Sequence, residues 1–140
     1  MRSLEEWFEK YGESHQNPTN KLIHFICVPA IVFSVLGLLW AASPYATYAV
    51  LILALLFYLR LSFKIMLATA LMLAPMVWGL SQMDSHLYPS LAIFVVAWIF
   101  QFVGHKIEGK KPSFFEDLQF LLIGPIWVLG FLMRKLGISY

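Results

Sequence analysis

Cysteine and charged residues are both scarce in this sequence. The one cysteine, Cys27, lies inside an apolar run, so we expect no internal disulfide and no cysteine-rich metal site. Charged residues make up 13% of the chain, against about 25% in soluble proteins. Clusters of basic residues interleaved with aromatic residues are also missing, so we expect no nucleic-acid partner. A hydrophobic content of 60% is typical of a membrane protein with no separate soluble domain.

The first 21 residues lack the basic start and the apolar centre of a secretory signal peptide, so we expect no cleaved leader. Ser3 and Glu6 have the spacing of a helix capping box. Apolar residues then recur every three to four positions, which predicts an amphipathic helix over residues 4–14. This helix is too short to cross a bilayer, so its aromatic side is expected either at the membrane interface or against a helical bundle.

Apolar runs fill most of the remaining sequence. Four of them come close to the ~20 residues that cross ~30 Å of hydrocarbon. These are residues 22–42, 45–61, 64–82 and 87–103. A fifth run, residues 118–133, is cut in half by Gly124-Pro125 and either spans or re-enters the membrane. The sequence therefore predicts an all-α fold with residues 1–140 in one domain, a polytopic membrane helical bundle of four to five transmembrane segments.

Two helical stripes of polar residues interrupt this apolar pattern. The late stripe has positions i, i+3, i+7 and i+10 and consists of Trp98, Gln101, His105 and Glu108. The early stripe has positions i, i+3 and i+7 and consists of Asn17, Asn20 and His24. An unpaired polar group in hydrocarbon costs several kcal/mol, so each stripe is expected to face a partner.

The number of crossings predicts that the two stripes are partners. Four spans separate His24 from His105, and an even number returns the chain to the same side of the membrane. Basic residues gather on that side, which the positive-inside rule makes cytoplasmic. We expect the membrane to be the inner membrane of a bacterium. His86 lies nineteen residues before His105, about 28 Å along a helix, so we exclude it from the site.

Three histidines and one carboxylate can therefore converge at the cytoplasmic end of the bundle. The candidate metal ligands are His15, His24, His105 and Glu108. Imidazole and carboxylate groups suit Fe(II), Zn(II) and similar ions. The alternative is that these side chains only cap helices or hydrogen-bond to neighbouring helices.

Other polar residues near these positions are candidates for supporting roles. Asn17, Asn20 and Gln101 are placed to orient the imidazoles or to contact a substrate. Tyr11 either donates a hydrogen bond to a ligand or packs with its aromatic neighbours. Lys106 either anchors the helix at the membrane surface or attracts a fatty carboxylate.

The two polar stretches together resemble a known membrane family. Residues 11–29 read YGESHQNPTNKLIHFICVP, and residues 98–125 read WIFQFVGHKIEGKKPSFFEDLQFLLIGP. Their pattern, Y-x3-H-x-N-x2-N-x3-H followed by W-x2-Q-F-x-G-H, is similar to that of the Mpo-like family, typified by the fungal 2-hydroxy-palmitic acid dioxygenase. The resemblance implies a small multi-span protein that uses Fe(II) and O₂ to shorten 2-hydroxy fatty acids by one carbon. It also implies that His15, His24 and His105 are the essential histidines.

We therefore expect an Fe(II)-dependent membrane dioxygenase that acts on a long-chain 2-hydroxy fatty acid and O₂ and contacts membrane lipid. Two other classes fit the same residues: a Zn-dependent membrane lipid hydrolase, in which the metal activates water, and a non-catalytic lipid-binding membrane scaffold. A transporter fits less well, because the polar groups gather at one face and form no path through the midplane. The sequence leaves acyl length and oligomeric state open.

Overall fold

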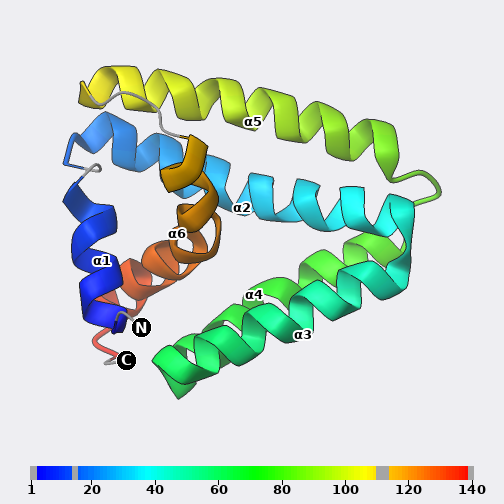
Figure 1. Ribbon diagram of the computed structural model, residues 1–140, viewed down its shortest axis with the longest axis horizontal. Coiled ribbons are helices and arrows are strands. Elements are labelled where there is room, and N and C mark those ends of the chain that lie inside the picture. The colour runs from blue at the N-terminus through cyan, green and yellow to red at the C-terminus, as the bar shows by residue number, and fades with distance from the viewer. Residues whose placement is uncertain (1–2, 14–15, 110–113, 139–140) are drawn as a thin grey trace.

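The computed structural model describes residues 3–13, 16–109 and 114–138, with side chains at all of these except 10, 13 and 114–121. Every regular element in the described ranges is an α-helix, and these helices form one layered bundle (Figure 1). They are α1 (Leu4–Glu13), α2 (Pro18–Ala42), α3 (Pro44–Leu61), α4 (Phe63–Ser81), α5 (Leu87–Glu108) and α6 (Phe114–Lys135). The predicted all-α fold is confirmed.

Single serine residues join the central helices. Ser43 ends α2 and begins α3, and Ser62 ends α3 and begins α4. Both have extended backbones, with φ −168° and −166°, and both accept a hydrogen bond on the side chain from the helix that follows. Such a cap breaks one helix and starts the next within one residue. The chain therefore reverses direction twice with very short connections, which stacks α2, α3 and α4 as antiparallel neighbours.

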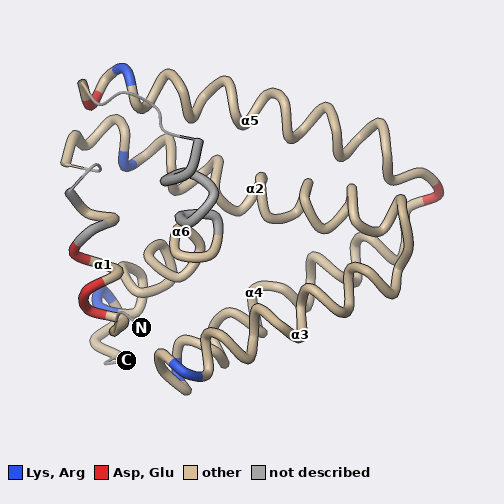
Figure 2. Tube along the Cα trace, viewed as in Figure 1, with Lys and Arg blue, Asp and Glu red and all other residues tan. Residues whose placement is uncertain are grey.

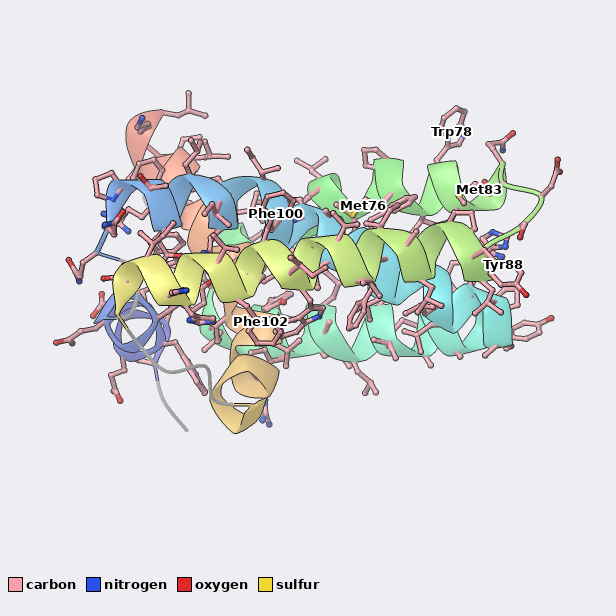
Figure 3. All side chains as sticks on the ribbon, turned by 90° about the horizontal axis from the view of Figure 1, so that it is seen from above. Met76, Trp78, Met83, Tyr88, Phe100 and Phe102 are labelled. Carbon is pink, nitrogen blue, oxygen red and sulfur yellow. The ribbon has the colours of Figure 1, made fainter. Side chains whose placement is uncertain are left out.

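Four helices are long and apolar enough to cross a membrane among the residues that the structure describes: α2, α3, α4 and α5. Their outer faces carry large apolar side chains, among them Trp78 and Tyr88, which are 69% and 76% exposed and point away from the bundle (Figure 3). Charged residues on these helices lie only near the helix ends (Figure 2). Extended apolar surface of this kind fits an integral membrane protein.

One helix agrees with the sequence prediction beyond its membrane span, and one differs. The span predicted to end at residue 103 lies in a helix that continues to Glu108, as the late polar stripe requires, and Gly109, at φ 79°, terminates α5. Hydropathy declines after residue 103, but the backbone hydrogen bonds continue until a glycine supplies the left-handed cap. The break predicted at Gly124-Pro125 is wrong, because α6 runs through Pro125 without interruption. The Tyr58 hydroxyl donates a 2.7 Å hydrogen bond to the carbonyl of Leu122, which ties α3 to this part of α6.

The amphipathic helix α1 packs against protein. Its apolar residues Leu4, Phe8 and Tyr11 are buried in one cluster with Ile123 and Trp127 of α6. Ser3 caps it, because the Glu6 backbone N–H donates to the Ser3 hydroxyl at 3.2 Å. The aromatic side of α1 was expected either at the membrane interface or against a helical bundle, and in the structure it packs against the bundle. The helices α1 and α6 thus cover the end of the bundle where α2 begins (Figure 1).

The most extensive helix pair in the bundle is α2 with α5. Two glycines, one on each helix, allow the close approach. A Cβ atom on Gly37 would overlap the Ser90 hydroxyl, and a Cβ atom on Gly104 would overlap the amide oxygen of Asn20. Small residues at a helix crossing bring the backbones together in this way. The two contacts lie toward opposite ends of the pair and fix its antiparallel register.

We expect Gly37→Ala to destabilise the protein by roughly 1–3 kcal/mol, because the added methyl group overpacks the α2–α5 contact. Thermal unfolding of the detergent-solubilised protein measures the effect. Gly12→Ala is the matched control, since no described atom lies within 4 Å of its added Cβ atom. Adding Ser90→Ala to Gly37→Ala should recover part of the loss. Equal melting temperatures for the two glycine variants would contradict the close packing.

Candidate functional site

The start of α2 and the end of α5 lie side by side, and they bring the two polar stripes together (Figure 1). The Glu108 carboxylate joins them directly. Its Oε1 atom accepts a hydrogen bond from the backbone N–H of Asn17 at 2.8 Å and another from Nδ2 of Asn20 at 3.1 Å. Asn17 is itself the N-cap of α2, because its side chain accepts from the backbone N–H groups of Thr19 and Asn20. The predicted meeting of the early and late stripes is confirmed.

The hydrogen bond of His24 fixes which of its ring nitrogens carries a proton. The ring is 2% exposed, and Nδ1 lies 2.9 Å from the backbone carbonyl oxygen of Asn20. A carbonyl oxygen only accepts, so Nδ1 must donate, and in the neutral ring Nε2 then holds the lone pair. Metal-binding histidines commonly donate their other N–H to a backbone carbonyl in this way. Nε2 is therefore the ring nitrogen of His24 whose lone pair takes no part in this hydrogen bond, and metal binding there stays a prediction.

His105 faces His24 across the helix pair. It is also buried, at 8% exposed, and the two ring centres are 6.0 Å apart with the planes at 81°. An imidazole that binds a metal at about 2.1 Å has its centre about 3.2 Å from the ion, so two such rings lie at most about 6.4 Å apart. The observed separation falls within that limit. That limit corresponds to two rings on opposite sides of the ion, so 6.0 Å allows a shared ion only with a wide angle between the two nitrogen ligands.

Aromatic residues from α1 and α6 close one side of this histidine pair. Tyr11 is 2% exposed and meets the edge of His24, with the ring centres 6.4 Å apart. Trp127 packs on Tyr11 at 5.1 Å. Gly124 leaves room for the Tyr11 hydroxyl, which lies 3.1 Å from the place a Cβ atom would take. Tyr11 is therefore packed among aromatic residues beside His24, and its donation of a hydrogen bond to a ligand stays a prediction.

The other predicted residues lie at different positions around the pair. Gln101 is buried on α5, one turn before His105, and its Oε1 atom has no hydrogen-bond partner among the described residues. Lys106 is exposed on the outer side of the same helix. His86 lies at the far end of the bundle, where its ring stacks on Trp40 at 5.6 Å and its Nε2 atom is 2.7 Å from the carbonyl of Leu80. Its exclusion from the site is confirmed.

The complete predicted ligand set extends beyond the described residues. His15 lies outside them, so its place beside His24 and His105 stays a prediction. Within the ranges that the structure describes, no group of three or more histidine, cysteine, aspartate or glutamate side chains could hold a metal ion. The contacts of Glu108 make it the residue that joins α5 to the start of α2, and its role as a ligand stays a prediction.

Gly104 was not singled out from the sequence, although it stands beside His105 on the polar stripe. A Cβ atom there would lie 3.4 Å from Cε1 of His24 as well as overlap the Asn20 amide. The glycine therefore lets α2 place its imidazole close to α5. Its spacing of three and four residues from Gln101 and Glu108 is the signal that could have found it.

We expect Glu108→Ala to destabilise the protein by about 1–3 kcal/mol, because two buried N–H donors lose their acceptor. Glu108→Gln keeps an acceptor oxygen and should lose less than half as much. Glu9→Ala, on the exposed side of α1, is the control and should change little. Thermal unfolding in detergent measures all three variants. The link between the helices is contradicted if Glu108→Ala is as stable as Glu9→Ala.

Comparison with known proteins agrees with the geometry of this site. The sequence model of the family described as "2-hydroxy-palmitic acid dioxygenase Mpo1-like" matches residues 1–136. The chain is 33% identical over 135 residues to the 2-hydroxy-palmitic acid dioxygenase MPO1 of Saccharomyces cerevisiae, and the match covers 91% of this chain and 78% of that protein. No solved structure matches the chain. The chain belongs to the Mpo1-like family.

Proposed function

We propose that this protein is an Fe(II)-dependent membrane dioxygenase that shortens long-chain 2-hydroxy fatty acids by one carbon. The observation that carries the proposal is the buried pair of His24 and His105, 6.0 Å apart at one end of four apolar helices. The name of the yeast relative supports the substrate class, since that protein is a 2-hydroxy-palmitic acid dioxygenase.

His15, His24 and His105 are the proposed metal ligands. Nε2 of His24 is the nitrogen that would bind the metal, because Nδ1 donates a hydrogen bond to the Asn20 carbonyl. Glu108 acts mainly through Asn17 and Asn20, since its Oε1 atom accepts a hydrogen bond from each. Fe(II) held by these histidines would supply the reaction with O₂ that protein side chains cannot perform.

The protein contributes a dry and rigid setting for this chemistry. Tyr11 meets the edge of the His24 ring, Trp127 packs on Tyr11, and the Asn20 carbonyl holds the orientation of the His24 ring. Exclusion of water strengthens electrostatic interactions and limits side reactions of reactive intermediates. The fatty acid would place its polar head beside the histidines and its tail among the apolar helices. Lys106, exposed near the same end, is placed to attract the carboxylate of an incoming acid.

The histidine pair is proposed to lie on the cytoplasmic side of a bacterial inner membrane. Four basic residues stand at the corresponding helix ends: Lys21 near the start of α2, Arg60 at the end of α3, Lys64 at the start of α4 and Lys106 at the end of α5. At the other end, the connection between α4 and α5 contains Asp84 and no basic residue. The positive-inside rule then assigns the His24 end to the cytoplasm.

We expect the purified protein with Fe(II) to consume O₂ in the presence of 2-hydroxypalmitate and to release the acid one carbon shorter. His105→Ala should lower the rate at least 100-fold, because it removes a proposed ligand. His86→Ala, at the far end of the bundle, is the matched control and should keep the activity. An oxygen electrode and mass spectrometry of the product measure the reaction.

The same experiment separates the alternatives. Full activity of His105→Ala, or activity that survives a strong iron chelator, contradicts the proposal. Lipid hydrolysis without O₂ uptake, by protein that contains zinc, would favour a hydrolase that uses the same histidines to activate water. The scaffold hypothesis predicts no turnover, with His24→Ala lowering stability and leaving the metal content unchanged.

A further inference from the structure

Gln101 carries a buried hydrogen-bond acceptor that the proposed metal site does not use. Its side chain is 8% exposed, and its Oε1 atom has no partner among the described residues. A buried acceptor without a partner is unfavourable, so a ligand that donates a hydrogen bond to it binds more tightly. Ser90 and Trp98, also on α5, each have a buried polar atom without a partner among the described residues, the Ser90 hydroxyl and the Trp98 indole N–H, which is a donor. Of the three residues, Gln101 is nearest in sequence to His105.

The register of the helix pair places Gln101 level with His24. Gly104 packs against Asn20 and His24, while Ala97 lies in one cluster with Cys27 and Ile31. Gln101 stands between Gly104 and Ala97 on the same buried face of α5. It therefore lies opposite the turn of α2 that begins at His24. It is also one turn, about 6 Å along the helix, from His105.

An apolar groove begins beside this residue. A hollow of 390 Å³ runs along the α2–α5 seam, and small side chains line much of it, among them Cys27, Ala30, Ala92 and Ala97. Phe100, the neighbour of Gln101, lines the groove, and Figure 3 shows it on the opposite side of α5 from Phe102. The groove thus extends along the outside of the helix pair, where Ile26 and Phe100 are exposed, away from the level of Gln101 and the histidines.

The chemistry of a 2-hydroxy fatty acid matches this arrangement. Its carboxyl group is ionised at neutral pH and only accepts hydrogen bonds. Its 2-hydroxyl group is then the one hydrogen-bond donor in the molecule. The acyl chain is apolar and suits a groove without polar side chains.

We propose that Gln101 selects the hydroxylated substrate: its Oε1 atom accepts a hydrogen bond from the 2-hydroxyl group while the acyl chain lies in the α2–α5 groove. This inference rests on the proposed function and names the residue that distinguishes a 2-hydroxy acid from an ordinary fatty acid. A fatty acid without the hydroxyl group leaves the acceptor buried and unpaired. Sites that hydrogen-bond a substrate hydroxyl discriminate strongly against analogues that lack it.

Equilibrium binding to the Fe(II)-loaded protein without O₂ tests this proposal. Competition with a fluorescent fatty acid gives the Kd of 2-hydroxypalmitate and that of palmitate. The wild type should prefer the hydroxylated acid by at least tenfold. Gln101→Met keeps the side-chain volume and removes the acceptor, so the ratio should fall to near one while palmitate affinity stays unchanged. Gln101→Leu should give the same ratio, and thermal unfolding verifies that each variant is folded.

Ser90→Ala is the matched control. It removes another buried and unpartnered oxygen from the same helix, eleven residues before Gln101, and should leave the ratio unchanged. A wild-type ratio that persists in both Gln101 variants overturns the assignment, as does an equal fall in Ser90→Ala. If the wild type turns over 2-hydroxypalmitate in these cases, only the role of Gln101 fails. If the wild type neither prefers nor oxidises the hydroxylated acid, the proposed function fails.

A second variant tests the groove. Ala92 is exposed and lines the groove nine residues before Gln101, about 14 Å along α5. Ala92→Phe should weaken binding of 2-hydroxypalmitate at least tenfold and leave binding of a short 2-hydroxy acid unchanged, because a short chain does not reach this position. Unchanged binding of the long acid would assign the groove to a bilayer lipid or a second copy of the chain and overturn this part of the proposal.

Discussion

The close antiparallel packing of α2 on α5 is the contact on which the rest of the structure depends. Gly37 and Gly104 remove the side chains that would hold the two helices apart, and Ser90 and Asn20 occupy the space. Glu108 then fixes the register by accepting hydrogen bonds from two groups at the start of α2. The ring separation of 6.0 Å is near the upper limit for sharing one ion, so a small increase in helix spacing would separate the histidines.

The remaining helices help to separate the polar groups of the α2–α5 contact from an apolar environment. The outer faces of α3, α4 and α5 are apolar, and α1 and α6 cover the end where α2 begins. Tyr11 comes from α1 and meets the His24 ring, and Trp127 of α6 packs on Tyr11. A polar cluster at this place would be costly if its groups were unpaired, and most of the described groups form hydrogen bonds across or within the helix pair. Gln101 is one of the described residues whose buried polar atom has no partner among them, and it lies one turn before His105.

The sequence predicted the helices and the meeting of the two stripes, because apolar periodicity and an even number of crossings determine both. The sequence also predicted, through the late polar stripe, that this helix continues past its apolar run to Glu108, where α5 ends. It predicted a break at Pro125 that the packed helix α6 does not have. The partners of Glu108 lie about 90 residues away in the chain, and only the three-dimensional register of α2 and α5 selects them. The place of His15 stays a prediction.

The metal content of the protein tests the central claim most directly. Protein purified without O₂ and without added metal is analysed by mass spectrometry for iron and zinc per chain. We predict about one iron per chain in the wild type and in His86→Ala, and less than a tenth of that in His24→Ala, whose Nε2 atom is the proposed ligand. Iron retained in His24→Ala, or one zinc per chain in place of iron, would contradict a histidine-bound iron centre between α2 and α5.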